Sequence, residues 1–199
     1  MRLFVARPSP YARKAWSAVL ALGLEQRVGI VELPARMPTV PKPELEAVNP
    51  LGKVPALALD DGSTIVDSPV IVAWLDQLAG GGLIPAGTAR WRALTLEALA
   101  DGCMDAGVVL RVESLKPDQR RDRAEIAAHA AKIARTLDHV EAQDGWLGPG
   151  LDVGRLALAC AIEWLVFRRL VPDPLRGRPR LGAWHAAARD HPALVPTRP

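Results

Sequence analysis

Three consecutive glycines at residues 80–82, followed by Pro85, divide this chain into two parts with different hydrophobic patterns. Before the glycines, strand signals and helix signals alternate, whereas after them only helical periodicity remains. This division predicts a small α/β domain followed by an all-helical domain. We place the α/β domain at residues 1–78, the linker at 79–88 and the helical domain at 89–199.

The first part predicts the element order β-α-β-α-β-β-α. Apolar runs at 3–6 and 28–33 are typical of buried strands, and the helix between them predicts a parallel pair with a right-handed crossover. A proline-rich loop follows, with Pro34, Pro38, Pro41 and Pro43. Asp61-Gly62 predicts a tight hairpin turn. Ser68-Pro69 then begins the last helix of this part, because proline favours a first helical position.

The second part predicts four helices. The first is a long segment rich in alanine and leucine at residues 89–114, and Pro117 begins the second. Asp152 caps the third, because an aspartate before an apolar run accepts hydrogen bonds from the free N–H groups of a first turn. The fourth surrounds Trp184.

Composition excludes several classes of protein. Of the 199 residues, 49% are hydrophobic and 24% are charged, which predicts a folded chain with a core. The formal net charge of +3 is small and dispersed, so we expect no nucleic-acid partner. No run of eighteen apolar residues occurs, so no membrane span is expected. The two cysteines, Cys103 and Cys160, lie far apart and histidines are few, which favours the cytoplasm and argues against a metal site.

Three local patterns point to chemistry when they are taken together. Ser9-Pro10-Tyr11 lies where a strand meets a helix, Gly52-Lys53-Val54-Pro55 precedes a strand, and Asp67-Ser68 begins a helix. Each pattern alone is typical of an ordinary helix cap or turn. In this order and spacing they resemble the cytosolic glutathione S-transferase superfamily.

The resemblance covers nearly the whole chain. The segments 9–14, 49–57 and 67–76 resemble the thioredoxin-like domain of that superfamily. The segments at 98–106, 156–168 and the C-terminus resemble the helical domain of its bacterial members. The resemblance implies the glutathione transferase fold, glutathione as cosubstrate without a metal, and attack of its thiol on a small hydrophobic electrophile, as in detoxification.

Ser9 is the residue that the resemblance implies for thiol activation. A free thiol has a pKa of about 8.5, so only a small part is thiolate at neutral pH. A hydrogen bond from the Ser9 hydroxyl and the positive end of the following helix would both favour the thiolate and so lower its pKa. Tyr11, two residues later, is the alternative donor to the sulfur, and packing in the first helical turn is an equally good interpretation of it.

The other two patterns would hold the rest of glutathione. The resemblance implies a cis Val54-Pro55 bond that leaves the Val54 backbone able to pair with the cysteinyl unit of the peptide. Ser68 would receive the γ-glutamyl carboxylate at a helix N-terminus. Asp67, where family members usually carry Glu, would orient the ammonium or the Ser68 backbone. Lys53 would approach a ligand carboxylate. Lys42 would meet the glycine carboxylate, but a solvated loop lysine is the better interpretation of it.

By the same resemblance, the electrophile pocket would lie between the domains. Met104, Val108 and Arg111 fall at helical spacing and would line it. The alternatives are that Met104 and Val108 belong to the core and that Arg111 forms an interdomain ion pair with Glu113.

The resemblance also implies a homodimer, in which Asp101 or Asp105 would reach the partner's site. An exposed helix carboxylate without such a role is the alternative for each of them.

Two other functions compete with a transferase. One is a binding or adaptor protein with the same fold and no catalysis, because a fold alone does not fix an activity. The other is a different glutathione-dependent reaction, such as isomerisation or dehalogenation, at the same site. Ser9, Val54-Pro55 and Asp67-Ser68 occurring together argue against a binding protein, which need not keep all three.

Overall fold

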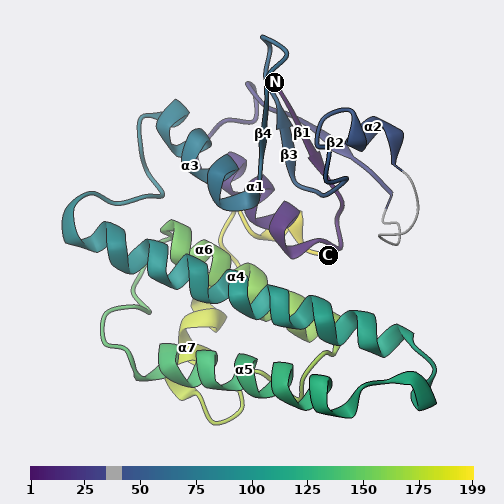
Figure 1. Ribbon diagram of the computed structural model, residues 1–199. Coiled ribbons are helices and arrows are strands. Elements are labelled where there is room, and N and C mark those ends of the chain that lie inside the picture. Colours follow the sequence, from purple (N-terminus) through teal and green to yellow (C-terminus); the bar gives the residue numbers. More distant parts are fainter. Residues whose placement is uncertain (35–41) are drawn as a thin grey trace. The chain divides into compact units, whose positions relative to one another are not determined.

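The computed structural model describes residues 1–34 and 42–199, which fold into two compact units (Figure 1). Unit 1 contains Met1–Gly87 together with His191–Pro199, and unit 2 contains Thr88–Asp190. The structure therefore groups the last residues of the chain with the N-terminal unit, although the sequence pattern placed them in the helical domain. Pro38 and Pro41 of the predicted proline-rich loop lie outside the described residues.

Unit 1 is built on a four-stranded sheet with the order β2-β1-β3-β4. The strands are β1 (Arg2–Val5), β2 (Gly29–Glu32), β3 (Ala56–Ala58) and β4 (Thr64–Val66). β1 and β2 are parallel, and β3 is antiparallel to both β1 and β4. The parallel pair and the antiparallel hairpin both agree with the sequence prediction.

Three helices cover this sheet: α1 (Pro10–Ala21), α2 (Pro43–Glu46) and α3 (Ser68–Ala79). α1 and α3 pack against each other and against the strands. Because side chains alternate along a strand, Phe4 and Ala56 share one face, and Leu45 of α2 packs there. The opposite face carries Leu3 and Leu57, which are fully buried. The result is a thioredoxin-like domain with its core on both faces of the sheet.

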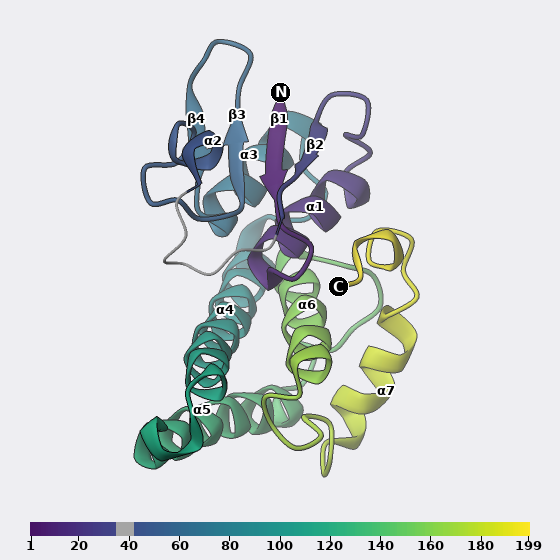
Figure 2. The ribbon, with the colours of Figure 1, turned by 90° about the vertical axis from the view of Figure 1, so that its right-hand side faces the viewer.

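Unit 2, all of whose residues are described, has helices as its regular secondary structure, joined by loops (Figure 2). Its helices are α4 (Gly87–Leu115), α5 (Arg123–Ala142), α6 (Val153–Arg168) and α7 (Pro179–Ala188), with a short 3-10 helix at Asp118–Arg120. α6 is apolar on nearly all sides and is buried along most of its length, so it forms the centre of this unit. Among the described residues no helix is long and apolar enough to cross a membrane.

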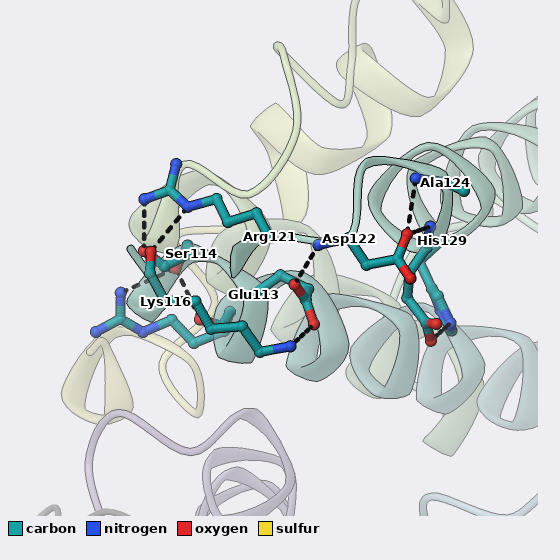
Figure 3. A network of polar contacts seen from close by, with 9 residues as sticks. Glu113, Ser114, Lys116, Arg121, Asp122, Ala124 and His129 are labelled. Carbon is teal, nitrogen blue, oxygen red and sulfur yellow. Dashed lines mark hydrogen bonds and ion pairs between the residues drawn. The ribbon is translucent and has the colours of Figure 1, made fainter. Parts of the chain in front are cut away.

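The turn between α4 and α5 differs from the sequence prediction (Figure 3). The pattern placed the start of the second helix at Pro117, but α5 begins at Arg123 and Asp122 is its N-cap. Glu113 explains the difference, because its buried carboxylate accepts hydrogen bonds from the Lys116 ammonium and from the Asp122 backbone N–H, the latter at 2.9 Å. These contacts hold residues 116–122 in a turn.

The predicted cap of α6 is confirmed. One carboxylate oxygen of Asp152 accepts the Arg155 backbone N–H at 2.9 Å. The Arg155 guanidinium also donates to the other carboxylate oxygen, through Nη2 at 2.6 Å. A positively charged side chain three residues after the cap thus fixes the capping carboxylate, instead of returning a bond to the backbone.

Candidate functional site

The register of the sheet brings the three sequence patterns to one end of its strands. Phe4 pairs with Ala56, and Ala56 pairs with Val66, so these residues form one row across three strands. Ser9 follows the end of β1, Val54 precedes the start of β3, and Asp67-Ser68 follows the end of β4. Because β3 is antiparallel to both neighbours, all three patterns lie at the same end of the sheet.

Ser9 is the N-cap of α1 and has extended backbone angles. Its Oγ accepts the Ala12 backbone N–H at 3.3 Å, which leaves the O–H of the same hydroxyl to donate. The first turn of α1 carries no acidic residue that would neutralise the positive end of the helix. Tyr11 lies half-buried in this turn. The helix end therefore offers a hydroxyl donor in a positive local field.

The Val54-Pro55 peptide bond is cis, as the resemblance implied. Val54 is half-buried, and none of the described residues forms a hydrogen bond with its backbone N–H or C=O. Asn49, which is 2% exposed, shapes the preceding turn: it donates to the Lys53 carbonyl at 2.8 Å and accepts the Leu51 N–H at 3.0 Å. Sequence reasoning gave Asn49 no role, although an asparagine before proline often begins such a turn.

Asp67 and Ser68 form the sharp entry to α3. Asp67 has a φ of 72°, in a region that residues other than glycine rarely adopt, and its carboxylate accepts the Ser68 N–H at 2.8 Å. Ser68 is 1% exposed, and its Oγ has no hydrogen-bond partner among the described residues. Buried hydroxyls are nearly always paired, so this one calls for an explanation.

The lysines proposed near the site differ in their surroundings. Lys53 is exposed, whereas its carbonyl is held by Asn49. The Lys42 ammonium donates to the Gly52 carbonyl at 3.4 Å, so Lys42 contacts the turn that leads to Val54. The sequence interpretation of Lys42 as a solvated loop lysine did not anticipate this contact.

The C-terminal segment of the chain packs on α1 through buried polar contacts. Thr197, which is 1% exposed, lies with its Oγ1 2.8 Å from the Ser17 Oγ and accepts from Arg13 Nε at 3.3 Å. Arg13 Nη2 also donates to the Leu194 carbonyl at 3.3 Å. Sequence reasoning missed this anchor, since nothing local in a helix shows that its buried polar groups pair with residues about 180 positions away.

The three residues proposed for the electrophile pocket all lie on α4 of unit 2. Met104 is fully buried, Val108 is 39% exposed and Arg111 is half-buried. The alternative for Arg111 is not observed: it donates to the Ser114 hydroxyl at 3.4 Å, and Glu113 pairs with Lys116. In the described part of the chain, no group of three His, Cys, Asp or Glu residues is placed to hold a metal ion.

Comparison with known proteins identifies relatives of this arrangement. The sequence model of the glutathione S-transferase N-terminal domain matches residues 8–78. The uncharacterized GST-like protein YibF of Escherichia coli K12 is 33% identical over 186 residues, which cover 91% of this chain and 90% of the relative.

Solved structures extend the likeness over both units. A glutathione transferase family member from Pseudomonas fluorescens Pf-5 with bound glutathione is 38% identical, with a TM-score of 0.94 over 100% of this chain and 98% of that one. A structure of a family member from the same organism with bound S-(propanoic acid)-glutathione has a TM-score of 0.87, at 38% identity and over 100% and 99% of the two chains. A glutathione S-transferase from Methylobacillus flagellatus KT with bound glutathione is 28% identical, with a TM-score of 0.84 over 100% and 98% of the two chains. The chain therefore belongs to the glutathione S-transferase superfamily, with its thioredoxin-like N-terminal domain and its helical C-terminal domain.

Proposed function

We propose that this protein is a glutathione transferase that binds glutathione on unit 1 and activates its thiol for attack on a small hydrophobic electrophile. The observation that carries the proposal is the Ser68 hydroxyl, which is buried and has no hydrogen-bond partner among the described residues. It lies at the same end of the sheet as Ser9 and Val54. A ligand carboxylate would accept the hydrogen bond that this hydroxyl lacks. Relatives at 38% and 28% identity have been solved with glutathione bound, which supports the choice of ligand.

Thiol activation would be the task of the N-terminus of α1. The Ser9 O–H donates to the sulfur, and the positive end of the helix adds to the stabilisation of negative charge. Both effects lower the pKa of the bound thiol, so its proton passes to solvent and the thiolate forms at neutral pH. The thiolate then forms a carbon–sulfur bond with the electrophile, and an aryl halide would release halide. Tyr11 is the alternative donor.

The rest of the peptide would be held by backbone and helix-end contacts. The Val54 N–H and C=O pair with the cysteinyl unit as an added strand, and Lys53 approaches a ligand carboxylate. Ser68 donates its hydroxyl to the γ-glutamyl carboxylate, and Asp67 faces the ammonium while it holds the Ser68 N–H. The electrophile would contact the face of α4 that carries Val108 and Arg111. We also propose that the protein is a cytoplasmic homodimer and that it acts in detoxification.

An adaptor without catalysis is the weaker candidate. An adaptor that does not bind glutathione would have no use for a buried hydroxyl left without a partner, because an unsatisfied buried group costs about 1–3 kcal/mol. A different glutathione-dependent reaction, such as isomerisation or dehalogenation, would use the same site and is separated from conjugation only by substrate.

Retention on immobilised glutathione tests the binding half of the proposal. We expect the protein to be retained and eluted by free glutathione, and Ser68→Ala to elute earlier. Ser63→Ala is the matched control, because Ser63 is exposed in the hairpin turn. A protein that passes through unretained would contradict the proposal. A screen with aryl halides, epoxides and peroxides then separates conjugation from the other glutathione chemistries.

A further inference from the structure

The backbone around Ser9 is fixed on both sides. The Ser9 backbone N–H donates to the Ala6 carbonyl at 2.8 Å, and this bond closes a turn whose two central residues are Arg7 and Pro8. On the helical side, the Arg13 backbone N–H donates to the Ser9 carbonyl at 3.0 Å. The direction of the Ser9 side chain therefore depends on where this turn is held, and the Arg7 side chain leaves from the middle of the turn.

Arg7 connects the turn to three other parts of unit 1. Its Nε and Nη2 donate to the two carboxylate oxygens of Glu32, each at 3.2 Å. Its Nη1 donates to the Pro196 carbonyl at 3.3 Å and to the Arg198 carbonyl at 3.4 Å. The guanidinium carbon also lies 5.0 Å from the centre of the Trp16 ring. One side chain thus joins the end of β2, the C-terminal segment and α1.

The partners of Arg7 lie close to the proposed thiol-activating group. β1 and β2 are parallel and Val5 pairs with Glu32, so Glu32 stands at the same end of the sheet as Ser9. Trp16 follows Ser9 by seven residues, which is about two helical turns and places it near the same side of α1. Arg7 therefore ties the turn to β2 and to the side of α1 where Ser9 lies.

These contacts are better suited to fixing a position than to adding stability. The Arg7 and Glu32 side chains are 41% and 44% exposed, and exposed ion pairs add little to stability. A two-point contact between a guanidinium and a carboxylate does, however, set the orientation of both groups. Orientation matters for the proposed donor, because a hydrogen bond weakens steeply when its angle departs from linear.

We infer that Arg7 is a positioning residue for thiol activation, which holds the turn so that the Ser9 hydroxyl points at the sulfur of bound glutathione. This inference rests on the proposed function and adds to it a residue that acts through Ser9. Charge alone does not replace Arg7, because a lysine ammonium cannot form the planar two-point contact with Glu32.

The test measures the pKa of the glutathione thiol in its complex with the protein, from the ultraviolet absorbance of the thiolate as the pH is raised. We expect Arg7→Gln to raise this pKa by roughly one unit and to lower turnover of an aryl halide at neutral pH on the order of tenfold. Glutathione affinity should change little, since Val54 and Ser68 hold the rest of the peptide. Arg7→Lys should lie between Arg7→Gln and the unmodified protein.

Glu32→Gln separates position from charge, and it keeps the contacts of Arg7 with Trp16 and with the C-terminal segment. If Arg7 acts by position, this change weakens the two-point contact and raises the thiol pKa, by less than Arg7→Gln does. If only charge matters, the loss of a carboxylate from this end of the sheet lowers the thiol pKa. A lowered pKa in Glu32→Gln would therefore overturn the inference, even where Arg7→Gln fails to fold.

Arg2→Gln is the matched control. Arg2 also lies over an aromatic ring, with 5.6 Å to the centre of Phe4, but it is exposed and stands at the opposite end of β1 from Ser9. It should leave the thiol pKa and turnover unchanged. A lower melting temperature of Arg7→Gln with an unchanged thiol pKa would show that the contacts serve only the fold, and the inference would be wrong. An unmodified protein that does not bind glutathione, or binds it without lowering the thiol pKa, would contradict the proposed function itself.

Discussion

Ser9 has two roles that a substitution must separate. Its Oγ caps α1, and its O–H is the proposed donor to the sulfur. Loss of a serine cap costs about 1 kcal/mol of stability. Loss of a hydrogen bond to a charged group costs roughly 1.5–3 kcal/mol. Here that loss would destabilise the thiolate and so raise the pKa of the bound thiol.

We expect Ser9→Ala to lower turnover on the order of tenfold to a hundredfold at neutral pH, with little change in glutathione affinity. Turnover should recover in part at higher pH, because the bound thiol would ionise there without the donor. A pH–rate profile beside glutathione titrations measures both effects. Ser9→Thr keeps a hydroxyl and is the control. If Ser9→Ala keeps full turnover and an unshifted profile, Tyr11 or a backbone N–H is the donor.

Ser68 should behave in the opposite way. Its hydroxyl is buried without a partner, so removing it from the free protein should leave the melting temperature unchanged or raise it slightly. The same change removes a donor to the ligand carboxylate, and we expect glutathione affinity to fall roughly tenfold or more. Thermal unfolding with and without glutathione tests both statements. A Ser68→Ala variant that is less stable but binds normally would show that the hydroxyl serves only the fold.

At the scale of elements, the sequence predicted most helices and strands because their signals are local. Asp61-Gly62 gave the hairpin, and Asp152 gave the start of α6. The predicted start of α5 was wrong because Pro117 and Asp122 are both residues that favour the beginning of a helix. The choice between them is made by Glu113, which reaches Asp122 from the end of the preceding helix. A side chain nine residues away leaves no local signal.

The Glu113 contacts make the α4–α5 turn sensitive to pH. The hydrogen bond from Lys116 and then that from Asp122 hold the pKa of Glu113 below its usual value of 4.5. Because the pKa of Glu113 is lower in the folded protein than in the unfolded chain, this stabilisation is complete above the unfolded-state pKa. It is lost as the pH falls through the folded-state pKa. We therefore expect Glu113→Gln to melt at a lower temperature than the unmodified protein at pH 7, with the difference shrinking below about pH 4.5.

Thermal unfolding between pH 3 and pH 7 measures this difference, at values chosen to span the titration of a carboxylate. Glu25→Gln is the control, because Glu25 is exposed in unit 1 and should change nothing. A difference between Glu113→Gln and the unmodified protein that stays constant with pH would mean that the contacts act by shape and not by charge.

At the scale of the whole molecule, unit 1 is assembled from both ends of the chain. Strand and helix patterns do not reveal which unit a tail will pack on, so the sequence placed residues 191–199 with the helices. The buried contacts of Thr197 with Arg13 and Ser17 instead hold the tail on α1 of unit 1. These contacts lie on α1, the helix whose N-cap is Ser9, so the tail anchors the proposed thiol-activating element.

Thr197→Val keeps the shape of the side chain and removes its hydroxyl. We expect a loss of about 1–3 kcal/mol in the free energy of unfolding, because the Ser17 hydroxyl and Arg13 Nε lose a buried partner. The double variant Ser17→Ala/Thr197→Val should recover part of this loss, since fewer polar groups are then left unpaired. Denaturant unfolding of the three proteins measures it. Equal stability of Thr197→Val and the unmodified protein would show that the tail is not an anchor.

The last prediction concerns association. Leu51 and Val70 of unit 1 are 69% and 53% exposed, and Trp91 of unit 2 is 68% exposed, so each leaves a large apolar side chain in contact with water. A two-fold contact between copies of the chain would cover such residues, because each would meet the complementary surface of the partner. We expect light scattering at micromolar concentration to give the mass of a dimer, and Leu51→Glu to shift it toward the monomer by placing a charge in that contact. Val195→Glu, at an exposed residue of the C-terminal segment, is the control that should keep the dimer. If the unmodified protein has the mass of a monomer, these exposed residues have another role and the homodimer is wrong.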